Sequence, residues 1–147
     1  MHISQLKDKN IVVLGAGVTG MSCVRFLHKH DLAFAINDSR EFLATQKGNK
    51  SLAEQEFINS YPKAQLVLGH WDKKLINDAQ LLIVSPGIDL AEQNITAMIN
   101  ENCQVVGDVE LFCLFNSQLL QPSKILAVTG SNGKSTVVSL LTSIARS

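Results

Sequence analysis

Residues 11–20, with the sequence IVVLGAGVTG, decide the fold of this chain. The first four are apolar and end at a glycine, and a short apolar run that stops at turn residues predicts a buried parallel strand. The turn that follows has the spacing GxGxxG, a weak signal alone that gains weight between a strand and a helix. A helix is expected next, because Met21, Val24 and Leu27 recur at helical steps. The stretch therefore predicts a strand, a glycine turn and a helix in direct succession.

The same alternation continues outward from this unit. Four more apolar runs end at turn residues and predict strands at 33–36, 65–68, 81–84 and 105–106. Alternating strands and helices with short connections predict an α/β fold, a doubly wound, Rossmann-like, parallel five-stranded sheet.

Helices are expected between these strands. Ser51 and Glu54 form a capping-box signature for a helix that ends near Pro62. A second helix is predicted over 91–99, with Asn102 as its left-handed stop. Asp108 and Glu110 are expected to start another helix and to pack between domains, and Trp71 to pack beneath a loop.

Composition bounds the class of protein. The 147 residues suffice for one compact domain and a little more, and 46% hydrophobic with 18% charged residues indicates a real core. Thirteen Lys plus Arg balance thirteen Asp plus Glu, so neither nucleic acid nor a membrane is an expected partner. Three cysteines without metal-type spacing, and no long apolar run, lead us to expect a cytoplasmic location.

A second glycine-rich turn, 129–136 with the sequence TGSNGKST, follows an apolar run at 125–128 and precedes an amphipathic helix. A predicted strand, a Gly-Lys-Ser turn and a helix make a phosphate cradle, in which Lys134 reaches the terminal phosphates and the Ser135 hydroxyl ligates magnesium. The spacing departs from GxxxxGK[ST], because Val128 stands where the first glycine belongs.

The two turns predict two domains. Residues 1–117 are expected to form the first, and 118–123, which include Pro122, a linker. Residues 124–147 are expected to supply the first strand, phosphate loop and helix of a P-loop ATPase domain that the chain begins and does not finish.

The ligand of the first turn is open on these residues alone. Its helix N-terminus offers amides to a diphosphate without any Lys or Arg. Asp38 ends the second strand, where a dinucleotide-binding domain places an acid on ribose hydroxyls, so NAD is one candidate. Arg40 complicates that interpretation, and an ordinary dehydrogenase has no use for a second phosphate loop.

The chain resembles the Mur ligases, whose shortened ATP loop TGxNGK[ST] is matched by residues 129–135. Within that family it is most similar to the members that add D-glutamate. Four ordered matches carry the resemblance: VxGxGxTG at 13–20, an acid-hydroxyl-Arg triplet at 38–40, SPGI at 85–88 and GD[IV]ELF at 107–112.

This resemblance implies an ATP- and Mg2+-dependent ligase of peptidoglycan synthesis that joins D-glutamate to UDP-N-acetylmuramoyl-L-alanine through an acyl phosphate. The implied UDP-precursor site consists of Gly17, Val18, Thr19, Asp38, Ser39, Arg40, Ser85, Pro86 and Gly87. The implied ATP site consists of Gly130, Ser131, Asn132, Gly133, Lys134, Ser135 and Thr136, with Lys134 as catalytic residue and Ser135 as metal ligand.

Three functions remain open: a UDP-precursor ligase of this or another Mur type, an NAD-dependent oxidoreductase domain, and a non-catalytic nucleotide-binding module. The resemblance places the D-glutamate site and further metal ligands outside these residues, so the chain alone is expected to bind the precursor without forming an amide. Because the last helix has an apolar face, residues 124–147 are expected to be mobile, to pack on a neighbour, or to be exchanged between two copies.

Overall fold

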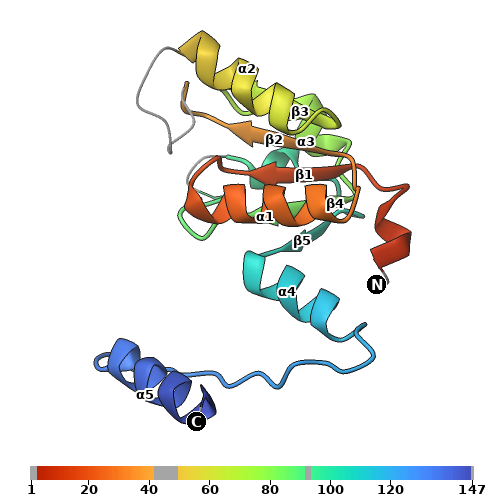
Figure 1. Cartoon of the computed structure of the whole chain (residues 1–147). Helices are drawn as coiled ribbons and strands as arrows, with labels where there is room; N and C mark the ends of the chain where they lie inside the picture. The colour runs from red at the N-terminus through yellow and green to blue at the C-terminus, as the bar shows by residue number, and fades with distance from the viewer. Residues whose placement is uncertain (1–2, 42–49, 92–93, 147) are drawn as a thin grey trace.

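A five-stranded parallel sheet lies at the centre of the molecule, with strand order β3-β2-β1-β4-β5 (Figure 1). The computed structural model describes residues 3–41, 50–91 and 94–146. The strands are β1 (Ile11–Leu14), β2 (Phe34–Asp38), β3 (Ala64–Leu68), β4 (Leu81–Val84) and β5 (Gln104–Val106). All five predicted strands and the parallel α/β arrangement are therefore confirmed, with β2 reaching two residues further than expected.

Side chains that alternate along the strands divide the core into two layers. Ile11 and Val13 of β1 face one layer, while Val12 and Leu14 face the other. The first layer is covered by α1 (Val18–Lys29), α2 (Lys50–Ser60) and α4 (Asp108–Asn116). The second is covered by the short helix α3 (Lys73–Asn77) and the segment around the 3-10 helix η2 (Thr96–Met98). Burial on both faces explains why the strands are almost continuously apolar.

The helix predicted over 91–99 is wrong. In the described part of this segment the only helix is η2, and the residue with left-handed backbone is Asn94, at φ 54°, rather than Asn102. The Leu90 carbonyl accepts the amides of Ile95 and Thr96 at 2.9 and 3.1 Å, which makes a turn. Ile95 is fully buried in the second core layer, so its apolar spacing serves packing without a regular helix.

Other helix boundaries also differ from expectation. The helix α2 begins at Lys50, so Ser51 lies inside it rather than before it. The helices α3 and η1 (Ile3–Leu6) were not predicted. Asp72 caps α3 by accepting the Leu75 amide at 2.9 Å. The expected helix start at residues 108–110 is confirmed, because Glu110 accepts the Gly107 amide at 2.9 Å and α4 begins at Asp108.

The C-terminal part is organised differently. The strand predicted at 125–128 is wrong: this stretch is extended but pairs with no strand in the part of the chain that the structure describes. A strand is stable only when a neighbour takes its hydrogen bonds. The helix α5 (Lys134–Arg146) contains no buried residue and is joined to α4 by an extended segment (Figure 1). Across the described ranges, no helix combines the length and apolar character needed to cross a bilayer.

Candidate functional site

A cleft of about 400 Å³ lies at the carboxyl ends of the central strands. Parallel open sheets bind ligands at this edge, because the loops after the strands meet there. Its lining residues come from four separate segments of the sequence: Gly15, Gly17, Val18, Thr19, Asp38, Ser39, Arg40, Trp71, Ser85, Pro86, Gly87 and Ile88. The structure thus brings together all nine residues expected at the UDP-precursor site, and adds Gly15, Trp71 and Ile88.

The glycine turn is fixed tightly against the sheet. Gly15 has φ +92°, a conformation that L side chains rarely adopt, and its amide donates to the Asn37 carbonyl at 2.8 Å. At Gly20 an added Cβ would lie 1.7 Å from the Gly15 carbonyl oxygen. The helix α1 can therefore start this close to β1 only because residue 20 has no side chain.

The start of α1 is open to an anion. Gly17 is its N-cap, no side chain caps the helix, and its first turn contains no acidic residue. Val18 is 75% exposed. The first amides of a helix lack partners within the helix and carry a partial positive charge, so the amides of Val18 and Thr19 can bind an anion without a cationic side chain.

Asp38 is the most heavily bonded side chain of the cleft. Its Oδ1 accepts the Arg40 amide and the Arg40 Nε, both at 2.9 Å. Its Oδ2 accepts the Ala16 amide at 2.7 Å and the Arg40 Nη2 at 2.6 Å. A carboxylate offers about four lone-pair sites. All four are taken, so Asp38 connects the glycine turn to Arg40 and has no acceptor left for a ligand.

The charge of Asp38 is stabilised by this arrangement. The side chain is only 3% exposed, and burial alone would favour the neutral acid. The hydrogen bonds from Arg40 and Ala16 and the Arg40 charge outweigh that burial and hold the pKa of Asp38 below its usual range. Arg40 itself is 57% exposed, so its guanidinium is fixed at one edge and accessible at the other.

Ser85 to Ile88 form the wall beside β4. The Ser85 amide donates to the Leu14 carbonyl at 3.1 Å, and its hydroxyl donates to the Gly15 carbonyl at 3.4 Å. The Ile88 amide donates back to the Ser85 carbonyl at 3.0 Å, and the Ile88 side chain packs on the second core layer. This turn is therefore attached directly to the glycine turn of β1.

Asn37 holds the wall of the cleft that contains Trp71. The sequence analysis did not predict this role. It is fully buried, and its Nδ2 donates to the carbonyls of Val67 at 3.1 Å and His70 at 2.7 Å. Its Oδ1 accepts the Asp72 amide at 2.9 Å. These bonds fix the loop that carries Trp71 into the cleft. A polar side chain inside an apolar strand was the signal that could have revealed it.

The second glycine turn stands apart from this cleft. Residues 129–136 are exposed or nearly so, and Gly130 and Gly133 have positive φ of 147° and 75°. The Lys134 Nζ folds back to donate to the Gly130 carbonyl. Within the described ranges no three His, Cys, Asp or Glu side chains gather as a metal site. Of the expected magnesium site, this turn contains Ser135.

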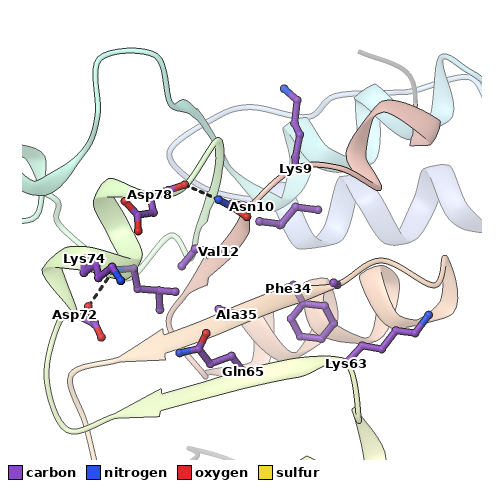
Figure 2. A pocket seen from close by; sticks show the side chains of 13 residues that line it. Lys9, Asn10, Val12, Phe34, Ala35, Lys63, Gln65, Asp72, Lys74 and Asp78 are labelled. Atoms are coloured by element: carbon purple, nitrogen blue, oxygen red, sulfur yellow. Dashed lines mark hydrogen bonds between the residues drawn. The ribbon is translucent and has the colours of Figure 1, made fainter.

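A second cavity, of about 440 Å³, lies at the amino ends of β1, β2 and β3 (Figure 2). Three of its polar residues are used locally: Asn10 donates to the Asp78 carbonyl, Asp72 caps α3, and Lys63 pairs with Asp31. Ligands of open parallel sheets bind at the other edge. The cleft at the carboxyl ends is therefore the candidate site.

Comparisons with known proteins agree with this geometry. Residues 9–107 match the family model described as "Mur ligase MurD-like, N-terminal domain". A protein of Colwellia psychrerythraea named UDP-N-acetylmuramoylalanine--D-glutamate ligase is 57% identical over 144 residues, which cover 98% of this chain and 30% of that protein. Its namesake from Nitrosococcus oceani is 42% identical over 135 residues, covering 92% and 27%. The chain thus spans less than a third of these relatives.

Solved structures support the fold. A pseudomurein peptide ligase type C from Methanothermus fervidus has a TM-score of 0.55 at 23% identity, covering 93% of this chain and 26% of that one. The precorrin-2 dehydrogenase SirC has a TM-score of 0.52 at 12% identity, covering 98% and 69%. Identities this low concern the fold alone, whereas the family model covers more than half of the sequence. The chain belongs to the MurD-like branch of the Mur ligase family.

Proposed function

We propose that the cleft binds the UDP end of UDP-N-acetylmuramoyl-L-alanine, and that the chain is the N-terminal part of a D-glutamate-adding ligase. The single observation that carries this proposal is that the residues of separate sequence motifs come together in one cleft. Nine residues from three motifs that are distant in the sequence line one cleft at the carboxyl edge of the sheet. The names of the relatives, which are ligases of UDP-N-acetylmuramoylalanine and D-glutamate, supply the substrate class.

The cleft is chemically suited to a uridine diphosphate. The amides of Val18 and Thr19 meet the diphosphate at the start of α1. Uracil offers one N–H donor between two carbonyl acceptors, a pattern that the Ser39 hydroxyl and the free edge of the Arg40 guanidinium complement. Asp38 acts indirectly in this proposal, by holding Arg40 and the Ala16 amide in place.

The same geometry argues against NAD. A dinucleotide-binding domain needs a carboxylate at the end of the second strand that accepts ribose hydroxyls. Asp38 stands at that place, but its four acceptor sites are already taken by Ala16 and Arg40. An NAD ribose would have to displace an internal ion pair.

The second glycine turn fits a triphosphate. Two positive-φ glycines open α5, and Lys134 lies over the turn with its Nζ on the Gly130 carbonyl. In the proposed reaction ATP supplies the phosphoryl group that makes the muramoyl-alanine carboxylate reactive toward the amine of D-glutamate. Lys134 would stabilise charge on that group, the amides of 130–133 would wrap the phosphates, and the Ser135 hydroxyl would hold Mg2+.

The proposal assigns the residues of this chain to two units. Residues 1–117 form the precursor-binding domain, 118–123 the linker, and 124–147 the start of the ATP-binding domain. Because the chain spans 30% or less of its relatives, the complete reaction, with D-glutamate and a cytoplasmic location, is proposed for the whole protein.

Amide formation tests this proposal. The full-length protein is expected to release ADP and phosphate when it receives UDP-N-acetylmuramoyl-L-alanine, D-glutamate and ATP, and to prefer D-glutamate over L-glutamate. Residues 1–147 alone are expected to form no product. A full-length protein that turns over another amino acid, or product made by residues 1–147 alone, would overturn the assignment.

A further inference from the structure

We infer that Trp71 forms the stacking wall for the uracil ring and so determines the preference of the cleft for a nucleoside over a bare diphosphate. This inference rests on the proposed function and adds a residue to it. Trp71 was expected to pack beneath a loop, but the structure places it in the lining of the cleft, together with the glycine turn and Arg40.

Trp71 lies where the core and the cleft meet. Trp71 is partly buried and packs against the second core layer, the cluster that contains Leu14 and Ala35. It also lines the cavity that Arg40 and Ser85 line. A ring held in this way loses little conformational entropy when a ligand arrives.

The loop that carries Trp71 is fixed at both ends. The Gly69 amide donates to the carbonyls of Asp38 and Arg40, both at 3.0 Å. On the other side, Asp72 donates its amide to Asn37 and caps α3 with its side chain. The backbone segment that supplies Arg40 and the backbone segment that supplies Trp71 are therefore hydrogen-bonded to each other.

Trp71 supplies an aromatic ring to the described lining of the cleft. The other eleven described residues of the lining are glycines, small or polar residues, short aliphatic residues, Pro86 and Arg40, so Trp71 is the one aromatic ring among the lining residues that the structure describes. Hydrogen bonds read the edge of a base, whereas its faces need an apolar or aromatic partner. Base–aromatic stacking contributes about 1–3 kcal/mol per base by alanine substitution, which corresponds to roughly fivefold to 150-fold in affinity.

The composition of the chain makes this directly measurable. Trp71 is its only tryptophan, so intrinsic emission reports on this ring alone. Residues 1–147 are titrated with UDP and, separately, with inorganic pyrophosphate, and each titration is followed by both calorimetry and tryptophan fluorescence. We expect UDP to bind and to quench the emission, and pyrophosphate to bind more weakly with little change.

Two variants separate stacking from mere packing. Trp71→Phe keeps an aromatic face and should retain UDP affinity within about threefold, whereas Trp71→Leu should lose roughly tenfold or more. Neither should change pyrophosphate affinity, which a general loss of structure would lower in parallel. Thermal unfolding of both variants checks that they fold.

The outcomes are distinct. UDP binding in calorimetry with unchanged tryptophan emission, or equal UDP affinity in Trp71→Leu and wild type, would overturn the inference and leave the proposed function standing. Absence of UDP binding to the wild-type chain would overturn the proposed function, and the inference with it.

Discussion

The two glycine turns of this chain have similar sequence signals and very different surroundings. The first, at residues 15–20, is bonded to Asn37, Asp38 and Ser85 and pressed against β1. The second, at 129–136, is exposed, and the helix α5 that follows it contributes no buried residue. Its Lys134 bonds within its own turn.

This difference separates a motif from a site. A glycine turn before a helix supplies the amides that bind phosphate, whatever surrounds it. Affinity also depends on how much of the binding geometry exists before the ligand arrives. In the described residues the first turn has that preorganisation from the core, so the uridine site is expected to work within these 147 residues and the ATP site to depend on further contacts.

The largest difference between the two turns is expected when one methyl group is added to each of them. Gly20→Ala places a Cβ 1.7 Å from the Gly15 carbonyl, so we expect a loss of about 3 kcal/mol in the free energy of unfolding and no UDP binding. Gly133→Ala meets no atom within 4 Å and strains only an exposed turn, so global stability should stay unchanged. Urea unfolding of both variants measures the contrast. Equal stabilities would contradict the account.

The next test concerns Asn37, whose side chain holds the loop that carries Trp71. Asn37→Ala leaves the Asp72 amide and two carbonyls without their partner in a part-buried place, at a cost of about 2 kcal/mol in unfolding free energy. UDP affinity should fall as well, because the loop that carries Trp71 loses its anchor.

Asn116→Ala is the matched control for this variant. Asn116 is also buried, but it makes two hydrogen bonds with Ser123, at the end of α4 and outside the cleft lining. It should lose stability while keeping UDP affinity. Loss of UDP affinity in both variants to the same degree would mean that the Asn37 effect is general destabilisation.

A smaller effect is expected at Asp38. Asp38→Asn removes the charge that Arg40 and the Ala16 amide share, at a cost of about 1.5 kcal/mol at neutral pH. The pKa of Asp38 is lowered in the folded state, so its contribution is present above the unfolded value of about 4 and is lost as pH falls through the folded pKa. Stability measured from pH 7 to pH 2 should therefore fall less steeply below about pH 4 in the variant.

Asp31→Asn is the control for the pH experiment. The Asp31 carboxylate is exposed and pairs with Lys63, which is also exposed, so its removal should scarcely change stability at neutral pH. Its backbone has φ 57°, a conformation that asparagine tolerates well. If Asp31→Asn and Asp38→Asn behaved alike, the special role of the buried carboxylate would be refuted.

The smallest effect is expected in the second turn. Lys134→Ala removes an exposed side chain whose hydrogen bond stays within its own turn, so neither unfolding free energy nor UDP affinity of residues 1–147 should change. In the full-length protein the same variant should abolish ligase activity, since Lys134 is the proposed charge-stabilising group. Weakened UDP binding in the short chain would show that the two turns are coupled.

Sequence reasoning succeeded where the local pattern and the global fold demand the same thing. The strands β1 and β4 were predicted with their observed bounds, because buried parallel strands are apolar throughout and end abruptly at turns. The nine cleft residues also came together as expected, because carboxyl ends of parallel strands meet at one edge.

Sequence reasoning failed where contacts between segments distant in the sequence determine the local structure. Apolar residues over 91–99 imitate a helix, but the pocket that Ile95 fills is formed by other segments. The apolar run at 125–128 has no strand to pair with in the described residues. A polar Asn37 inside an apolar strand signals a buried hydrogen-bonding role, but its partners and the place of Trp71 depend on the loop between β3 and α3, whose path is not written in the local pattern.

The most direct test of the central claim is the ligand preference of the first cleft. It is measured by calorimetry on residues 1–147, with UDP and NADH in separate titrations. The account predicts one molecule of UDP bound per chain and no heat of binding from NADH. Saturable binding of NADH with no response to UDP would contradict it.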